Sequence, residues 1–245
     1  MRNFYPIRKF GRRDLLKMSA GLLGLAAAST ILPKALLKPD AVEAASSTTL
    51  ITEPDLVFAA TDGWIYLPPP SVGHYHPDNM APSPFTTYIF GFRDVTGMTR
   101  AQAMAQKMKA QLTAPTWWIN EGQDFTLRLT NLGLQIRPDL IDAHTLHFHG
   151  FRNAIPIFDG EPHSSVGVPI ARDLTYFYRP HHPGTYMYHC HFEETEHVHM
   201  GMVGAVFVRP AMGPKFAYND ASTEFDREFV LCMNEVWTLA HWCDS

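Results

Sequence analysis

Residues suited to metal chemistry are concentrated in one stretch of nineteen residues, 184–202, with the sequence GTYMYHCHFEETEHVHMGM. They include His189, Cys190, His191, His197, His199, Met200 and Met202. A thiolate, imidazoles and a weakly held thioether are the ligands of a mononuclear blue-copper site. A histidine next to the cysteine on a strand faces the other way, where it can bind a different metal ion. The stretch therefore predicts copper binding, with room for a second site.

A second histidine cluster lies upstream, in the sequence AHTLHFHGF at residues 143–151. Side chains alternate between the two faces of a strand, so His147 and His149 share a face and His144 lies on the other. The same alternation separates Cys190 from its two flanking histidines. Two sites are therefore predicted. One contains His144, Cys190, His197 and Met202, and the other contains His147, His149, His189 and His191.

The elements that must hold these residues are mostly short strands. From Pro115 to Pro210, alternating segments are separated by turn residues. Earlier strands are expected at Leu56–Ala60 and Phe85–Arg93, and a helix is expected at Thr99–Leu112, where apolar residues recur about every four positions. This pattern predicts an all-β fold, an antiparallel Greek-key β-sandwich with one short inserted helix.

Other possible ligands lie outside the two clusters. His74 and His76 fall in a Pro-rich segment, which predicts an exposed loop with surface histidines. If Cys190 binds metal, Cys232 and Cys243 remain, and the sequence does not decide whether they form a disulfide.

The N-terminus has the features of an export signal. Arg12 and Arg13 precede a short apolar run, which is typical of the twin-arginine route. The run Leu22–Leu32 is shorter than the roughly 20 apolar residues that cross a membrane. Removal of residues 1–44 would leave a mature chain without a membrane span. We therefore expect a periplasmic or secreted protein.

The charge of the mature chain excludes one class of function. Of the 20 Lys/Arg and 24 Asp/Glu, eight and three lie in residues 1–44, which leaves 12 and 21 and a net charge of about −9. A surface that binds nucleic acid has the opposite sign. We therefore expect no nucleic-acid partner.

The two clusters together resemble a known family. The motifs H-x-x-H-x-H-G and H-C-H-x5-H-x4-M, with HPGTY before the second, are similar to the cupredoxin domain of multicopper oxidases, and most similar to the small two-domain laccase group. The likeness extends over Pro115–Pro210. It implies type 1 copper ligands at His144, Cys190, His197 and axial Met202. It implies a type 2 ligand at His147 and type 3 ligands at His149, His189 and His191.

The resemblance also implies an activity. Type 1 copper would take electrons from a small reducing substrate or a metal ion, and a trinuclear cluster would reduce dioxygen to water. Asp159 lies where related oxidases carry an acid that supplies protons, although a turn aspartate before Gly160 is an equal interpretation. Glu193, Glu194 and Glu196 either attract a cationic substrate or form a solvated acidic loop.

Two features depart from the family pattern. Five residues, Phe192–Glu196, precede His197 where the family has three, which leaves His199 as an alternative type 1 ligand. A trinuclear centre takes eight histidines, and this chain supplies four. The missing set is expected from identical subunits in a trimer or another symmetric homo-oligomer, or from a second domain. After the signal peptide at 1–44, we expect a cupredoxin domain at 45–210, followed at 211–245 by a linker and the first strand of a truncated second cupredoxin domain.

Other classes of function stay open at this point. Copper nitrite reductases have a similar domain order, but their active-site Asp falls at His147 and no histidine falls at His191, which favours oxygen as the acceptor. A single-cupredoxin electron carrier has no use for four further metal-facing histidines. A copper-storage module is the remaining alternative.

Overall fold

The computed structural model describes residues 53–67, 79–83, 85–151 and 155–241. Predictions for residues 1–44, His74, His76 and Cys243 lie outside the described residues. Within them, no helix is long and apolar enough to cross a membrane.

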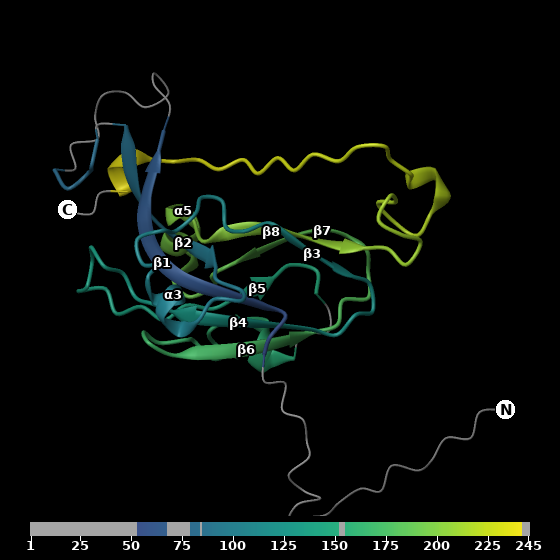
Figure 1. Cartoon of the computed structure of the whole chain (residues 1–245), viewed down its shortest axis with the longest axis horizontal. Coiled ribbons are helices and arrows are strands. Elements are labelled where there is room, and N and C mark those ends of the chain that lie inside the picture. Colours follow the sequence, from purple (N-terminus) through teal and green to yellow (C-terminus); the bar gives the residue numbers. More distant parts are fainter. Residues whose placement is uncertain (1–52, 68–78, 84, 152–154, 242–245) are drawn as a thin grey trace, which may run out of the picture. The chain divides into compact units, whose positions relative to one another are not determined.

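Two four-stranded sheets form the body of the chain (Figure 1). One has the strand order β2-β1-β4-β6 and the other has the order β3-β8-β7-β5. The strands are β1 (Leu56–Tyr66), β2 (Thr86–Asp94), β3 (Trp117–Asn120), β4 (Phe125–Asn131), β5 (His147–Phe148), β6 (Asp173–Tyr178), β7 (Gly184–His189) and β8 (Val203–Arg209). The helices are α3 (Arg100–Met104), α4 (Pro156–Asp159), α5 (Glu194–Met200), η2 (Ala221–Thr223) and η3 (Thr238–His241).

The prediction of an all-β, cupredoxin-like sandwich is confirmed, because the regular secondary structure of the described residues is mostly strand and the helices are short. The core between the sheets is rich in aromatic rings. Trp117 stacks on Phe125 with ring centroids 4.6 Å apart, and Phe148 stacks on Tyr188 at 5.5 Å. Such pairs stabilise a core beyond the apolar area they bury. The second pair also joins β5 to β7, which carry His147 and His189.

The antiparallel pairing expected from the sequence holds for four strand pairs, and two other pairs are parallel. Strand β1 pairs with β4 in parallel, and β3 pairs with β8 in parallel. Parallel neighbours need a crossover connection, and several elements lie between the members of each pair. Spacing along the sequence does not reveal which distant strands become neighbours.

The predicted helix at 99–112 is shorter in the structure, and it is not the only helix. Thr99 caps α3 in a capping box with Gln102, but the helix ends at Met104. The chain then follows the first sheet, where Gln111 forms a bridge with Phe92. Gly91 permits this approach, because a Cβ there would lie 2.7 Å from the Gln111 carbonyl oxygen. Two more short α-helices, α4 and α5, lie next to the predicted ligands.

The apolar run Glu228–Leu239 forms no strand in the structure. The side chains of Phe229, Leu231 and Met233 are 79%, 87% and 95% exposed. A strand needs a partner for its backbone groups, and neither of the two sheets of the described residues includes this run. Its assignment to a second cupredoxin domain stays a prediction.

A buried carboxylate joins β1 to the segment that leads toward His144. Oδ2 of Asp62 accepts hydrogen bonds from the Tyr88 hydroxyl at 2.7 Å and from the backbone N–H groups of Gln135 and Ile136 at 2.7 and 2.9 Å. We expect Asp62→Ala to lower the free energy of unfolding by about 3 kcal/mol, because three donors lose their acceptor. Urea unfolding of the copper-free protein measures this. Asp139→Ala, at an exposed carboxylate, is the control and should change stability by less than about 0.5 kcal/mol. Equal losses in the two variants would contradict this role.

Candidate metal centres

The first cluster is a buried set of one thiol and two imidazoles. Cys190 directly follows β7, His197 lies on α5, and His144 is held by a backbone bridge to Val168. The Cys190 Sγ lies 3.8 Å from Nδ1 of His144 and 3.3 Å from Nδ1 of His197. All three side chains are buried. The structure thus brings together three of the four predicted type 1 ligand atoms within 4.8 Å of one another.

These distances suit a metal ion. Metal–nitrogen and metal–sulfur bonds of about 2.0 and 2.3 Å, at trigonal or tetrahedral angles, place the two atoms about 3.5–3.7 Å apart. The observed separations of 3.3 and 3.8 Å lie on either side of that value. A site with two histidines and one cysteine, completed by a weak axial thioether, is the donor set that copper prefers for electron transfer. The residues therefore fit copper.

Burial controls the charge of this cluster. It raises the pKa of the Cys190 thiol to about 11. Burial, followed by the neighbouring His197, holds the pKa of His144 well below its usual value, and burial also lowers the pKa of His197. All three groups are therefore neutral at pH 7 until a cation displaces the thiol proton, as metal binding to cysteine does. The backbone N–H of Thr145 donates to Sγ at 3.4 Å and would stabilise the thiolate.

Met202 lies beside the same cluster. Its side chain is fully buried, its N–H donates to the His197 carbonyl at 2.9 Å, and its carbonyl accepts from the Cys190 N–H at 3.1 Å. Two hydrogen bonds thus join Met202 to both residues. Its backbone position suits the axial role predicted for its sulfur.

The alternative ligand, His199, has different surroundings. Its ring packs on the ring of His241, with centroids 4.9 Å apart. The structure therefore places His197 opposite Cys190 and His199 against the C-terminal segment. Both histidines lie on α5, which begins within the five residues that precede His197.

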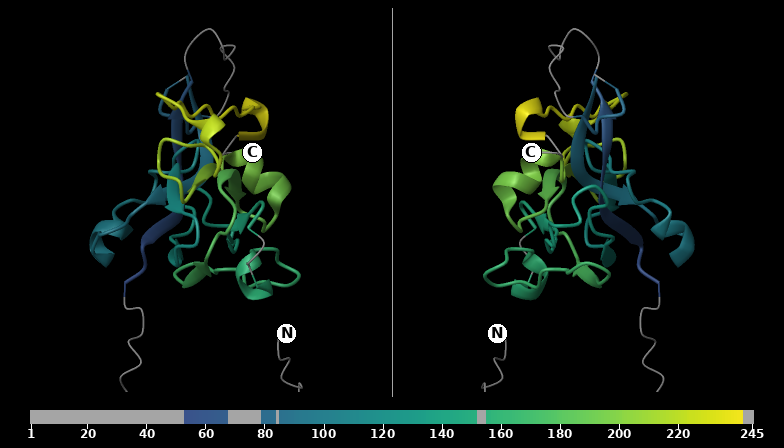
Figure 2. Two further views of the ribbon diagram at one scale, coloured as in Figure 1. Left: turned by 90° about the vertical axis from the view of Figure 1, so that its right-hand side faces the viewer. Right: turned by 90° about the vertical axis from the view of Figure 1, so that its left-hand side faces the viewer.

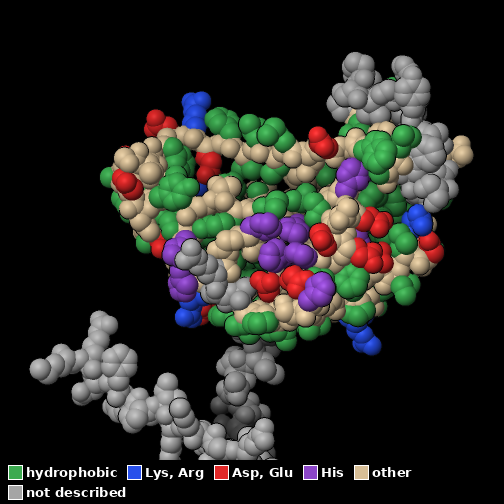
Figure 3. All heavy atoms as spheres, turned by 180° about the vertical axis from the view of Figure 1, so that it is seen from behind, with side chains coloured by type: hydrophobic (Ala, Val, Ile, Leu, Met, Phe, Trp, Pro, Cys, Tyr) green, Lys and Arg blue, Asp and Glu red, His purple; other side chains and the backbone are tan. Residues whose placement is uncertain are grey.

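The second cluster contains the other four predicted histidines. Strand β5 pairs with β7 in a register that sets His147 opposite His189, and His149 and His191 lie beside them. Neighbouring ring centroids are 5.0–5.4 Å apart. Figure 3 shows histidine side chains gathered on one face of the molecule, with acidic side chains next to them.

Hydrogen bonds orient two of these rings. Nδ1 of His147 donates to the Asp159 carbonyl at 2.6 Å, and Nδ1 of His189 donates to the Cys190 carbonyl at 2.7 Å. A histidine that donates through Nδ1 keeps Nε2 as the metal-binding atom. Nε2 of His189 lies 3.0 Å from Nε2 of His149, so a proton or a cation has to separate the two nitrogens. Burial, and then neighbouring histidines, lower the pKa of His149, so this ring is neutral at pH 7, and as a neutral imidazole it can donate Nε2–H to Nε2 of His189.

Asp159 contacts this cluster mainly through its backbone. Its carboxylate lies 3.8 Å from Nδ1 of His147, farther than the carbonyl that accepts the hydrogen bond. Asp159 is the last residue of α4, before Gly160 in the left-handed conformation. Asp159 can therefore be both a turn residue and an acid beside the cluster.

The sequence interpretation missed one carboxylate next to the first cluster. Oδ2 of Asp142 lies 3.6 Å from Nε2 of His197, on the side of the ring away from Cys190. Together with Glu193 it forms a possible cation-binding group at the outer edge of His197. The sequence signal that could have found it is its position two residues before His144, because alternate residues of an extended chain point the same way.

Comparisons with known proteins give one family. Residues 93–213 match a family model described as multicopper oxidase. No curated protein sequence matches the chain at a significant level.

Several solved structures are similar to this chain. A multicopper oxidase from Pseudomonas thermotolerans is 21% identical, with a TM-score of 0.44, over 62% of this chain and 28% of that one. A blue copper oxidase from Nitrosomonas europaea is 25% identical, with a TM-score of 0.46, over 64% and 39%. A multicopper oxidase from Campylobacter jejuni, described as a metallo-oxidase, is 21% identical, with a TM-score of 0.42, over 62% and 25%. This chain thus spans about a quarter to two fifths of their length.

Proposed function

We propose that this chain, which belongs to the multicopper oxidase family, takes electrons from a reducing substrate at a type 1 copper site and delivers them to a second copper site for the reduction of dioxygen. The observation that carries the proposal is the position of Cys190. Its Sγ faces His144 and His197, whereas its neighbours in sequence, His189 and His191, belong to the other cluster. One residue therefore links the two sites.

Each copper ion has proposed ligands. His144, Cys190, His197 and Met202 would hold type 1 copper. His147 would hold the type 2 ion, and His149, His189 and His191 would hold the type 3 ions. When bound, copper supplies one-electron transfer at the first site and dioxygen reduction at the second.

The chain provides a short path between the sites. Only the backbone of Cys190 separates its thiolate from the two flanking histidines. The hydrogen bond of 2.7 Å from Nδ1 of His189 to the Cys190 carbonyl adds a second connection and fixes the ring. Hydrogen bonds of this kind to a ligating histidine orient it and tune the metal.

The outer edge of His197 is the proposed point of entry for electrons. Asp142 and Glu193 lie at this edge and favour a cationic reductant, such as a metal ion, or a donor with an acidic proton. At the second cluster, Asp159 positions His147 through its carbonyl, and its partly exposed carboxylate supplies protons from solvent.

The second cluster offers half of the eight histidines that a trinuclear site takes. We infer that the other half comes from another domain or from an identical subunit in a trimer or another symmetric assembly. Export by the twin-arginine route to the periplasm is part of the proposal and is supported by Arg12 and Arg13. Small reductants and dioxygen are the proposed partners.

Counting copper tests this function. We expect a blue protein that binds more than one copper ion per chain and consumes dioxygen when a ferrous or phenolic reductant is added. Metal analysis, absorption spectroscopy and an oxygen electrode measure these properties, and light scattering gives the assembly state. A blue protein with one copper ion per chain and no oxygen uptake would be an electron carrier and would overturn the oxidase proposal.

A further inference from the structure

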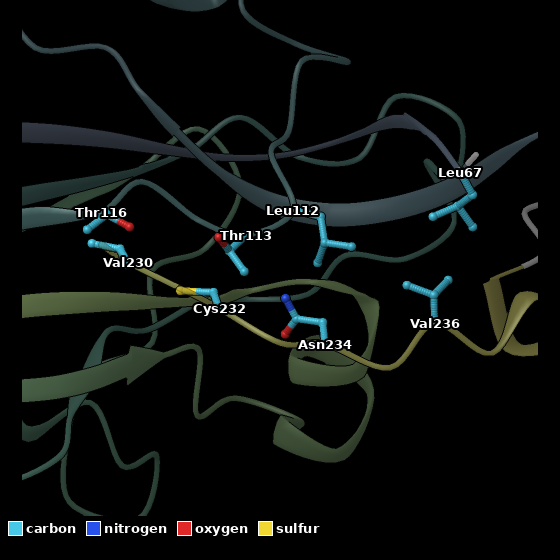
Figure 4. Close-up of a pocket in the computed structure, with 8 residues that line it drawn as sticks. All are labelled: Leu67, Leu112, Thr113, Thr116, Val230, Cys232, Asn234 and Val236. Atoms are coloured by element: carbon cyan, nitrogen blue, oxygen red, sulfur yellow. The ribbon is translucent and has the colours of Figure 1, made fainter. Parts of the chain in front are cut away.

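The C-terminal segment crosses the body of the chain in an extended conformation (Figure 1). A groove of about 430 Å³ lies between it and residues 112–116. Figure 4 shows that Val230, Cys232, Asn234 and Val236 line this groove. The intervening side chains are exposed. This part of the segment therefore has few close contacts with the body.

The two ends of the segment are held more firmly. The carboxylate of Glu228 forms an ion pair with Arg209 of β8 at 2.5 Å. At the other end, Nδ1 of His241 donates to the Tyr88 carbonyl of β2 at 2.6 Å, and the His241 side chain is completely buried. A fully buried histidine is unusual in a short 3₁₀ turn that follows an exposed segment. His241 therefore anchors η3.

The anchor lies against the helix that carries His197. The ring of His241 packs on the ring of His199 in α5, with centroids 4.9 Å apart. The views in Figures 1 and 2 agree in placing η3 beside α5. Residues two apart in a helix point about 200° apart. His197 accordingly faces Cys190 and the ring of Phe90, whereas His199 faces His241.

Helix α5 needs such support. It has seven residues, its N-cap Glu193 has a positive φ of 47° and forms no side-chain capping bond, and Gly201 ends it. A helix this short is not stable by itself and depends on the packing of its sides. The geometry of a type 1 site in turn depends on the placement of its ligands.

We propose that His241 is a positioning residue, which holds α5 through His199 so that Nδ1 of His197 stays opposite the Cys190 sulfur. The proposal rests on the type 1 assignment made above. In this proposal α5 is clamped from both sides, by the core at His197 and by η3 at His199. Loss of the outer contact lets the helix move and loosens one copper ligand.

Hydrogen exchange in the full-length, copper-free protein tests the clamp without copper. We expect His241→Ala to speed exchange of the α5 amides at least about tenfold, with no change in β4, because only local opening is made easier. His241→Gln keeps an N–H for the Tyr88 carbonyl and should restore part of the protection. His181→Ala, at an exposed histidine, is the matched control. His199→Leu removes the facing imidazole and should act as His241→Ala does.

The copper-loaded protein gives the second measurement. We expect His241→Ala to stay blue but to lose type 1 copper to a chelator about tenfold more readily than the wild type. The clamp would be overturned if the α5 amides exchange as slowly in His241→Ala as in His181→Ala. It would also be overturned if His241→Ala speeds amide exchange in α5 and β4 together. A wild-type protein that never turns blue would overturn the type 1 assignment, while the exchange result still decides whether His241 holds α5.

Discussion

Replacing Cys190 by serine is expected to abolish the blue absorption and to lower oxygen consumption by more than about a hundredfold. That factor is the upper range for losing a residue that merely supports a metal ligand, and Cys190 is proposed as a ligand itself. Its Sγ is within 3.8 Å of both histidine nitrogens, and it is the only thiol in the first cluster among the described residues. Absorption spectroscopy and oxygen uptake on the copper-loaded variant measure the two effects.

The neighbouring histidines provide matched controls. His191→Ala should keep the blue colour and lose oxygen consumption, because His191 belongs to the other cluster. His197→Ala should bleach the protein, whereas His199→Ala should not, since His199 packs on His241. If His199→Ala bleaches the protein and His197→Ala stays blue, the ligand loop has a different arrangement when copper is bound.

Gly160→Ala is expected to lower the free energy of unfolding by about 4 kcal/mol, near the upper end for a single substitution, because it combines overpacking with backbone strain. Gly160 has φ of 80°, and a Cβ there would overlap the Leu146 carbonyl oxygen and lie 2.8 Å from the backbone nitrogen of His147. The new atom would push α4 away from β5. The hydrogen bond from His147 to the Asp159 carbonyl would then be lost, so copper binding at the second cluster should weaken as well.

Gly97→Ala separates the two causes of that loss. Gly97 has a similar φ of 73°, but no atom of the described residues lies within 4 Å of the position that a Cβ would take there. The free energy of unfolding of Gly97→Ala should therefore fall only by the roughly 1–2 kcal/mol that a left-handed conformation costs alanine. Urea unfolding of the two copper-free variants measures the difference. Equal stability losses would show that the contact between α4 and β5 contributes nothing.

The division of the ligands between two clusters needed only local sequence information. Strand alternation separates Cys190 from His189 and His191, and it separates His144 from His147. This period is a property of any extended backbone, so it holds even though β5 has only two residues. The all-β class was predictable for the same reason, because alternating segments and turns are local features.

The placement of α5 required the tertiary structure. The spacing of His197 and His199 from Cys190 left two ligand choices, and α5 turns one toward the thiol and the other toward His241. Helix propensity in a seven-residue loop does not predict this, since packing of its sides decides whether it forms. The helix predicted from the apolar stripe at 99–112 is too long for a related reason. The residues after α3 pair with the backbone of the first sheet, so the helix ends early.

The sequence by itself determined which residue types are suited to metal binding, how they alternate, and which family they resemble. Only the tertiary structure decided that Asp142 lies at the outer edge of His197, that the Asp159 carbonyl orients His147, and that His241 packs on His199 of α5. Alternation depends on neighbours in the chain. These three contacts join residues on different elements, 12 to 55 positions apart along the chain, and they form only when the packed core brings those elements together.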